Sequence, residues 1–570
     1  MTWTRTALTL ALSSLMGPTL EIFGGSAARP GWMFWPMCIP IQAGLIKALQ
    51  IRITRWWEQR VILPSSFHIW PGKRARQTSW AYTNIRAITS GDPIWVEMQR
   101  RSFISVDGVS MAENMIQSNR LHRLVKLMMD SGEAKSVEEA QQILAQYRMG
   151  IQVRRGSAAS PAYQAALLTA VNTGRRCFLG GVQVAGDLDI PLSIPWRGCS
   201  TLAEATQDLQ GQIVSELPAG LPWIYFGDGI PKNTSTGFAI RPVVQGWNGG
   251  VLPACDPISF SMEETFTPAG VLAGAMAVSE AFQWIRGDSP LAGYRSVGLS
   301  LWQPSATANW QTAEPGPRLE YLPAKLWLIG LGHLGQAYLW TLGFLPYPVG
   351  SKVNLVLQDI DSLEDANDST SLLTNSALVG VKKTRAMAAW CEERGFQTSL
   401  IERIFAGDFN ISDSEPALVL CGVDNIEARR VLDKVGFKRI IEAGLGKGTQ
   451  EYLALKIHTF PGSRPADQCW KSTNEGSYSP VPLITQPAYQ DLLEKGADRC
   501  GLIELAGHSV GASFVGAVAS TLVIAQVLRL IIGESIDELI DGDLRSSSIL
   551  SCVVPNRSCL DLFNPGLIHI

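Results

Sequence analysis

The sequence of 570 residues predicts an α/β protein with a Rossmann-like core. Three observations carry this prediction. The apolar run 326–329 is typical of a buried parallel strand, and a glycine-rich loop follows it at once. An apolar helix at 336–344 and a second apolar strand at 353–357 come next. This order of strand, glycine loop, helix and strand is the βαβ unit of nucleotide-binding Rossmann-like folds.

The glycine loop has the spacing Gly330-x-Gly332-x-x-Gly335. We expect Gly330 to permit a tight turn, Gly332 to let the backbone approach a phosphate, and Gly335 to let the helix pack closely on the strand. Free N–H groups at the start of the helix then bind the phosphate. Asp359 follows Gly335 by 24 residues, close to the spacing of a carboxylate that binds ribose hydroxyls. The alternative is a Rossmann-like core with a vacant site.

The composition is that of a globular protein with a slightly high apolar content. Hydrophobic residues make up 46% and charged residues 17%, and the formal net charge is −3. Apart from a basic N-terminal stretch the chain is acidic, so we expect no nucleic-acid partner. The ten cysteines include no CxxC pair and no Cys/His cluster. This excludes a typical structural zinc site and suits a reducing, cytoplasmic location.

Residues 1–110 differ from the rest of the chain. They hold 8 of the 18 tryptophans, and residues 1–101 carry 12 Lys and Arg against 4 Asp and Glu. The apolar run 7–16 and the small residues at 26–28 resemble a signal peptide. We expect instead a poorly defined extension, or an upstream stretch translated in error, with the working protein starting near Met111.

Residues 111–148 are predicted to form a short helical segment, in which Ser136-x-x-Glu139 is a capping box. Residues 149–322 are predicted to form a second α/β domain, because β-like and helix-like runs alternate there. Its predicted strands are 151–153, 177–184, 223–226 and 238–244, and 162–171 is a predicted helix.

Two segments suggest an internal duplication. Residues 270–287 and 516–533 both start on Gly, pass from small to bulky apolar residues, and end on Gly 17 positions later. Since 149–322 has no glycine loop, we interpret it as the degenerate half. The stretch between Glu504 and Arg529 has no charged residue and is long enough to span a membrane. Its polar residues and its twin at 270 indicate a buried helix over a sheet, with no membrane partner.

More motifs follow the glycine loop in a fixed order. Asp361 is followed six residues later by Asn367, and Gly380-x-x-Lys383 opens a helix. The predicted strand 417–421 leads into Asp424, and Arg429 follows. This series resembles the adenylating domain of ThiF, MoeB and the ubiquitin-activating enzymes, with GxGxxG, then DxDxVxxSNLxRQ, then GxxK, then a strand ending in TDN and an Arg. The resemblance covers about 325–535, within a ThiF-type domain that we assign to 323–570.

The resemblance implies an enzyme that uses ATP and Mg²⁺ to adenylate the C-terminal carboxylate of a small ubiquitin-like or sulfur-carrier protein. By resemblance, Asp359 and Asp361 hold the ribose. Asn367 and Lys383 contact phosphates, and Asp424 helps to hold magnesium. Lysine is a compact charge for phosphate and aspartate is a hard oxygen ligand, so these roles are chemically reasonable.

Two positions depart from the family pattern. Thr370 stands where the family has a phosphate-binding Arg, so Lys382, Arg385 or an Arg of the other half has to supply that cation. His333 stands within the glycine loop, where a small residue is usual. It either donates to a phosphate or points away from it.

The placement of Cys500 resembles that of the catalytic cysteine in compact activating enzymes, where a thiol receives the acyl group and a conjugating enzyme takes it on. It lies between a predicted long loop at 461–497 and the helix at 516. Cys469 is the second candidate. The structural alternative is that each of these cysteines is a small buried hydrophobe.

Activating enzymes work as dimers or as fused active and inactive halves, so the resemblance implies a homodimer or an internal pseudo-dimer. Two other functions stay open at this point. An NAD-dependent oxidoreductase has the same glycine loop, but hydride transfer has no need of a magnesium carboxylate such as Asp424. A non-catalytic ThiF-fold protein that binds a partner is favoured by Thr370.

Overall fold

The computed structural model describes residues 119–570 except 197, 228–236, 262, 305–308, 471–483 and 554–564. The predicted extension over 1–110 and the start of the predicted helical segment lie outside the described residues. Two helices open the described chain, α3 (Arg123–Ser131) and α4 (Val137–Gln146). Ser136 caps α4 by accepting a hydrogen bond from the Glu139 N–H at 3.1 Å. The helix ends at Gln146, because Arg148 already begins a strand.

A seven-stranded sheet forms the first α/β half. Its order is β3-β2-β1-β4-β5-β6-β7, with the first five strands parallel and the last two antiparallel. The strands are β1 (Arg148–Val153), β2 (Gly181–Gly186), β3 (Gln212–Ile213), β4 (Trp223–Phe226), β5 (Ala239–Gln245), β6 (Asn248–Pro253) and β7 (Val297–Ser300). The helices are α5 (Arg155–Ala158), α6 (Pro161–Cys177), α7 (Leu202–Asp208) and α8 (Thr267–Arg286).

An eight-stranded sheet forms the second half, in the order β11-β10-β9-β12-β13-β14-β15-β16. The strands are β9 (Lys325–Ile329), β10 (Asn354–Gln358), β11 (Gln397–Ile401), β12 (Leu418–Cys421), β13 (Arg439–Leu445), β14 (Ala454–Phe460), β15 (Leu539–Asp543) and β16 (Ser546–Val553). The helices are α9 (His333–Gly343), α10 (Lys383–Glu392), α11 (Ile426–Arg430), α12 (Ala466–Cys469), α14 (Pro487–Glu494), α15 (Arg499–Gly507) and α16 (Ser513–Ile531). Strands β8 (Tyr321–Pro323) and β17 (Leu567–His569) pair separately.

The two halves share one topology. Strands β1 to β7 take the same order in their sheet as β9 to β15 take in theirs. Helix α8 lies between β6 and β7, and α16 lies between β14 and β15, so the two segments with matching sequences occupy equivalent positions. One contact is also repeated. The Leu331 N–H donates to Asp359 at 2.7 Å, and the Arg155 N–H donates to Asp187 at 3.1 Å, each linking the ends of the first two strands.

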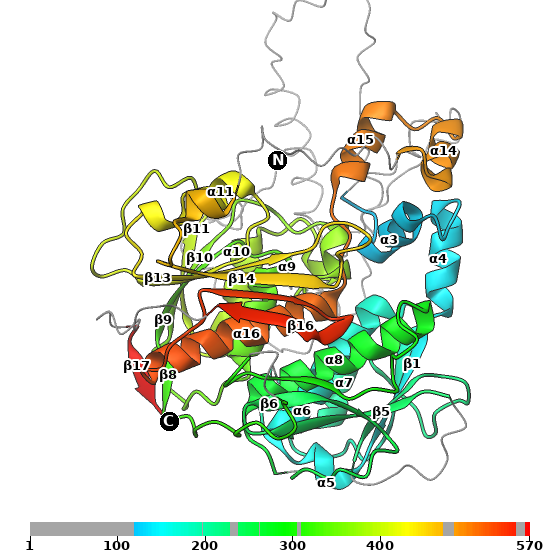
Figure 1. The fold of residues 1–570 in the computed structure, drawn as a ribbon, viewed down its shortest axis with the longest axis horizontal. Coiled ribbons are helices and arrows are strands. Elements are labelled where there is room, and N and C mark those ends of the chain that lie inside the picture. The colour runs from blue at the N-terminus through cyan, green and yellow to red at the C-terminus, as the bar shows by residue number, and fades with distance from the viewer. Residues whose placement is uncertain are drawn as a thin grey trace, which may run out of the picture. The chain divides into compact units, whose positions relative to one another are not determined.

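Helices α6, α8, α9 and α16 form a layer between the two sheets (Figure 1). Glycine makes the close packing of α8 on α6 possible, because a Cβ atom at Gly270 or Gly274 would lie 2.0 or 2.2 Å from a carbonyl oxygen of α6. Within the described residues, α16 is the helix long and apolar enough to cross a membrane, and most of it is buried. The prediction of a buried helix here is confirmed.

Two sequence predictions were wrong. Residues 177–184 were predicted as one strand, but Cys177 ends α6 and β2 starts at Gly181. Two arginines in the last turn of α6 bond to the second half of the chain, and basic residues there also suit the helix dipole. Residues 461–497 were predicted as a loop, but they include α12 and α14. Helix α14 starts on Pro487 and buries one side against the core.

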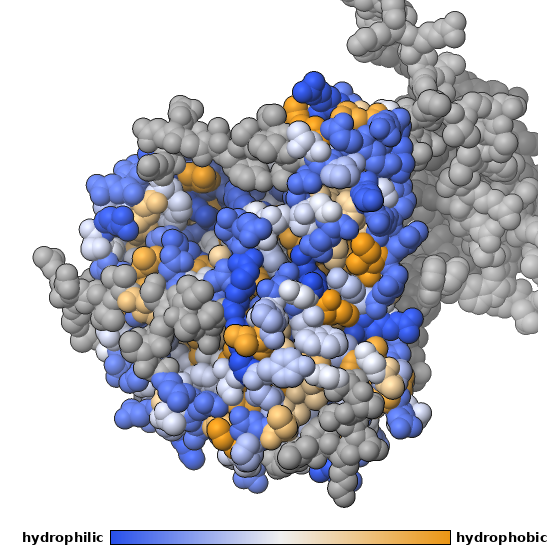
Figure 2. All heavy atoms as spheres, turned by 45° about the vertical axis from the view of Figure 1, so that its right-hand side comes forward, coloured by the Kyte–Doolittle hydropathy of each residue, from blue (hydrophilic) through white to orange (hydrophobic). Residues whose placement is uncertain are grey.

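The face shown in Figure 2 is mainly hydrophilic, with apolar residues scattered among polar ones. Single exposed apolar side chains are normal on the surface of a globular protein, so this face by itself indicates no binding function.

Candidate functional site

A cavity of about 400 Å³ lies at the carboxyl ends of the parallel strands of the second half. Strand β9 has β10 on one side and β12 on the other, so the connections turn in opposite directions at this point of the sheet. Ligands of open α/β sheets bind at such a switch point. The lining comes from the glycine loop, the ends of β10 and β12, the start of α10, helix α3 and two loops, at 445–447 and 509–512.

The glycine loop forms one wall of the cavity. Gly330 has φ +83, a left-handed conformation that favours glycine. A Cβ atom at Gly335 would lie 2.0 Å from the Gly330 carbonyl oxygen, so only glycine lets α9 pack here. A Cβ atom at Gly332 would have no atom within 4 Å. The loop therefore offers its backbone to open space at Gly332, where a bound phosphate would need it.

Asp359 holds the glycine loop in shape. Its Oδ2 accepts the Leu331 N–H at 2.7 Å, and its Oδ1 accepts the Asp361 N–H at 2.8 Å. Each carboxylate oxygen has a second lone pair, so Asp359 can still accept from a ligand hydroxyl. The Asp361 side chain is turned to Lys383, with Oδ2 2.8 Å from Nζ.

Lys383 is the first residue of α10 and lines the cavity. Burial acts to lower its pKa, but the carboxylates of Asp359, Asp361 and Asp424 outweigh this effect and raise the pKa above its ordinary value. The ammonium group is therefore charged at neutral pH. The structure brings this lysine and these three carboxylates to one place, although the chain separates them by up to 65 positions.

Asp424 and Asn367 also line the cavity. Asn425, next to Asp424, starts α11 by accepting the N–H groups of Glu427 and Ala428 at 2.8 and 3.2 Å. Asn367 Oδ1 accepts the Glu364 N–H at 2.9 Å. No group of three or more His, Cys, Asp or Glu that could hold a metal occurs in the described part of the chain. A magnesium ion here would thus be held by Asp424 and by ligand phosphates, as Mg²⁺ often is.

Thr370 is buried at the cavity wall and brings no charge. The substitutes that we predicted do not line the cavity. Lys382 donates to the Ile360 carbonyl, and Arg385 pairs with Glu402 at 2.8 Å. In the other half, Arg175 and Arg176 donate hydrogen bonds to the 368–374 segment and do not line the cavity.

Arg123 supplies a cation at the cavity, and it was not among the residues predicted from the sequence. It is the first residue of α3, in the helical segment that precedes both sheets. Burial lowers its pKa, while the negative charges of Glu364 and Asp424 oppose that effect. No local sequence signal marks this residue, because a single arginine in an amphipathic helix is usually a surface charge.

Two further cations lie at the β12 and β13 side of the cavity. Arg429 Nε donates to the Val423 carbonyl at 2.9 Å and lies 3.0 Å from the buried carboxylate of Glu442. Lys447 lies in the loop after β13, and its carbonyl accepts the Val510 N–H at 3.1 Å. That bond joins the two loops that close the cavity on this side.

His333 packs against α16. A Cβ atom at Gly516 would lie 2.3 Å from His333 Nε2, so this atom points to the helix and not to the glycine loop. Burial lowers the pKa of His333 to about 4, which leaves the imidazole neutral at pH 7. His333 therefore adds no positive charge for a phosphate.

This lowered pKa predicts a pH dependence of stability. The unfolded chain binds a proton at His333 below pH of about 6.5. In the folded chain that happens only near pH 4, so stability is lost as the pH falls between these values. Between pH 7 and pH 5 the free energy of unfolding should fall in both proteins. We expect the fall to be about 1–2 kcal/mol smaller in a His333→Gln variant than in wild type. Urea unfolding at both pH values measures this difference, and equal losses in the two proteins contradict the assignment.

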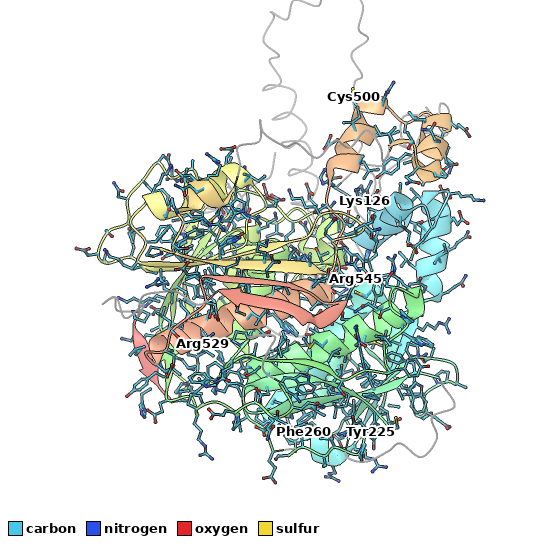
Figure 3. The ribbon with its side chains drawn as sticks, in the orientation of Figure 1. Lys126, Tyr225, Phe260, Cys500, Arg529 and Arg545 are labelled. Atoms are coloured by element: carbon cyan, nitrogen blue, oxygen red, sulfur yellow. The ribbon has the colours of Figure 1, made fainter. Side chains whose placement is uncertain are left out.

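The structure does not bring Cys500 to the cavity. It is the second residue of α15 and is exposed (Figure 3). The same helix ends at Gly507, and residues 509–512 line the cavity.

Cys469 ends α12 and is half-buried, and burial raises the pKa of its thiol. A raised pKa disfavours the thiolate, so Cys469 is the weaker nucleophile candidate.

Comparison with known proteins identifies the family. A family model described as BilD N-terminal domain matches residues 148–301, and one described as BilD C-terminal domain matches residues 322–534. A curated protein of Collimonas sp. (strain OK412), the bacterial E1-like protein BilD, is 40% identical over 423 residues. That match covers 74% of this chain and 91% of the relative. The chain belongs to the BilD family of E1-like proteins.

The membership confirms the E1-like resemblance that the sequence motifs indicate. In this BilD-family chain, the N-terminal domain match contains the whole seven-stranded sheet. The C-terminal domain match contains the glycine loop, Lys383, Asp424 and Cys500. Arg123 precedes both matched regions.

Solved structures are similar to part of this chain at low sequence identity and low TM-score. The structure of E. coli MccB with ATP is 19% identical, with a TM-score of 0.27. The match covers 42% of the BilD-family chain and 65% of the MccB chain, so just under two thirds of MccB is matched. The structure of E. coli tRNA N6-threonylcarbamoyladenosine dehydratase, TcdA, is 14% identical, with a TM-score of 0.23. That match covers 37% of the BilD-family chain and 86% of TcdA.

Proposed function

We propose that this protein binds ATP and Mg²⁺ and adenylates the C-terminal carboxylate of a small ubiquitin-like or sulfur-carrier protein. The observation that carries the proposal is the meeting of Lys383, Asp424 and Arg123 around one glycine loop. In the reaction, a carboxylate oxygen of the carrier attacks the α-phosphorus. The bond from that phosphorus to the bridging oxygen breaks, and pyrophosphate leaves with the electron pair.

Charge neutralisation is the main task of the protein in this reaction, since the transition state is stabilised by fixed dipoles and cations. The backbone N–H groups of the glycine loop bind phosphate oxygens at the start of α9. Lys383 and Arg123 approach the same phosphates from different elements, α10 and α3. Asp424 would hold Mg²⁺, which supplies positive charge to the leaving pyrophosphate.

Asp359 is suited to fix the nucleoside, because it stands at the end of β10 where a ribose-binding carboxylate occurs in Rossmann-like folds. In this proposal Asp361 acts mainly through Lys383, which it holds by an ion pair of 2.8 Å. Asn367 donates its amide to a phosphate oxygen. The acidic groups around Lys383 also leave the site attractive to a metal ion.

A second step follows in the proposal. The Cys500 thiolate attacks the acyl carbon of the adenylate, AMP leaves, and a thioester forms for delivery to a conjugating enzyme. This step requires α15 to move toward the nucleotide, because Cys500 does not line the cavity. We place the reaction in the cytoplasm, where ATP is present and thiols stay reduced. The N-terminal half acts as the inactive partner of an internal pseudo-dimer.

The test is pyrophosphate exchange into ATP with a purified carrier protein, followed by a thioester assay. We expect Cys500→Ala to retain exchange within about twofold and to lose the thioester-linked carrier completely, because a methyl group cannot accept an acyl group. Cys469→Ala is the matched control and should retain both. A thioester that persists in Cys500→Ala contradicts the role of Cys500, and absence of exchange in wild type contradicts the adenylation proposal.

The alternative functions are less well supported by the site. An NAD-dependent oxidoreductase needs no magnesium carboxylate, yet Asp424 stands in the cavity with Lys383. A non-catalytic role was favoured because Thr370 replaces a cationic residue. Arg123 supplies a cation to the same cavity, so this support is weakened.

A further inference from the structure

Helix α3 contacts the nucleotide cavity and also the helix that carries Cys500. Its first residue, Arg123, lines the nucleotide cavity. Three and seven residues further, Lys126 and Asp130 are buried against α14 and α15, and α15 carries Cys500. Figure 3 shows Lys126 on α3 and Cys500 at the outer end of α15.

Three polar side chains form the contact, and we call them the docking cluster: Lys126, Asp130 and Tyr489. Lys126 Nζ pairs with Asp130 Oδ2 and lies 3.4 Å from the Ala506 carbonyl of α15. The Tyr489 hydroxyl, on α14, donates to Asp130 Oδ1 at 2.6 Å. All three residues are at most 6% exposed.

Burying this ion pair is costly, because each charge loses its hydration. Burial lowers the pKa of Lys126 and raises the pKa of Asp130. Apolar side chains of similar size would give equal or greater stability at such a place. The cluster instead requires one geometry. Asp130 accepts from Tyr489 only when α14 is docked on α3, and Lys126 reaches the Ala506 carbonyl only when α15 is docked there too.

The two helices depend on this docking. Helix α14 has 8 residues and α15 has 9. Isolated helices shorter than about 12–15 residues are marginal in water. We therefore expect α14 and α15 to lose their helical structure when they leave α3. The chain just before α3 is bonded to the cavity wall. The Asn119 carbonyl accepts the Ala366 N–H at 2.9 Å, and Ala366 is next to the cavity residue Asn367.

We propose that the docking cluster positions the nucleotide cavity and the Cys500 helix relative to each other: it holds Arg123 in the cavity only while α14 and α15 are docked. ATP binding and docking then favour each other. The proposal rests on the proposed function, because Arg123 is taken to contact ATP. Linkage is reciprocal, so any loss of docking weakens ATP binding by the same factor by which ATP favours docking.

The test measures the affinity for the non-hydrolysable analogue AMPCPP with Mg²⁺ by calorimetry on the full chain. We expect Asp130→Asn and Tyr489→Phe to raise the Kd by about 5-fold or more. Tyr489→Phe removes only the hydroxyl and keeps the buried ring, so it preserves the packing. Lys495→Ala is the matched control: Lys495 follows α14, its ammonium is paired with Glu138 at the surface, and the Kd should stay unchanged.

Hydrogen exchange of residues 487–507 gives the second readout. AMPCPP should slow this exchange in wild type and in Lys495→Ala, but have no such effect in Arg123→Ala. Faster exchange in Tyr489→Phe with an unchanged Kd means that the cluster is only structural, and overturns the inference. Wild-type protein that binds no AMPCPP refutes the proposed function instead, and the inference falls with it.

Discussion

Replacing Lys383 with alanine is expected to lower the rate of pyrophosphate exchange about 10²- to 10³-fold, the cost of removing one well-placed charge-stabilising group. Its ammonium group stands among three carboxylates, at 359, 361 and 424, which raise its pKa. Without the lysine, these carboxylates face the triphosphate with less counter-charge, so ATP is repelled more strongly as well as poorly stabilised. Exchange of labelled pyrophosphate into ATP, at saturating carrier, measures the effect.

Lys382 is the natural control for this experiment. It is the adjacent lysine, but its ammonium group bonds to the Ile360 carbonyl and does not line the cavity. Lys382→Ala should therefore keep the exchange rate within about threefold, as expected for a surface change. Equal losses in the two variants, or full activity of Lys383→Ala, would refute the site that we assign.

The second large effect is expected for Arg123→Ala, with a loss of about 10³-fold in exchange, the lower range for an arginine that stabilises a transferring phosphoryl group. Thr370 leaves no cation at its own position, and the other candidates are paired elsewhere. Arg123 is the cavity cation that comes from outside both sheets. The measurement is the same exchange assay, with the Kd for ATP determined in parallel.

Arg120→Ala is the matched control, because Arg120 precedes α3 and its guanidinium pairs with Asp365 at the exposed surface, 3.4 Å away. Exposed pairs of this kind contribute little. We expect normal exchange in Arg120→Ala. Normal exchange in Arg123→Ala would instead show that the protein works without this cation. Lys447, which also lines the cavity, would then be the next candidate for the phosphate-binding cation.

Features that depend on short stretches of chain were predictable. The strand, glycine loop and helix over 325–343 follow from an apolar run and from three glycines, of which Gly330 needs a positive φ and Gly335 a close contact. The likeness of 270–287 and 516–533 indicated a duplication, and the equal strand orders of the two sheets agree with it. The order of Asp361, Asn367, Lys383 and Asp424 indicated the E1-like family.

Other features depend on contacts between distant residues, and there the sequence was insufficient. Cys177 was predicted to begin a strand, but it ends α6, since the hydrogen bonds that Arg175 and Arg176 make from the last turn to the 368–374 segment are invisible in the local pattern. Helix α14 was predicted as loop, because its stability comes from Tyr489 packing and bonding to α3. Cys500 was a candidate nucleophile from its place in the chain, and only the structure shows that it is exposed, as the second residue of α15, and that it does not line the cavity.

Local patterns were enough to predict the Rossmann-like core, the glycine loop and the acidic residues and lysine around it, because backbone conformation and hydrophobic periodicity are local properties. The cation that completes the cavity could be found only from the three-dimensional packing. Arg123 and Asp424 are 301 positions apart, and a helix before the first sheet brings them together. These two residues come together because α3 packs against both the 364–368 turn and α14. The spacing of residues along the chain does not predict this packing.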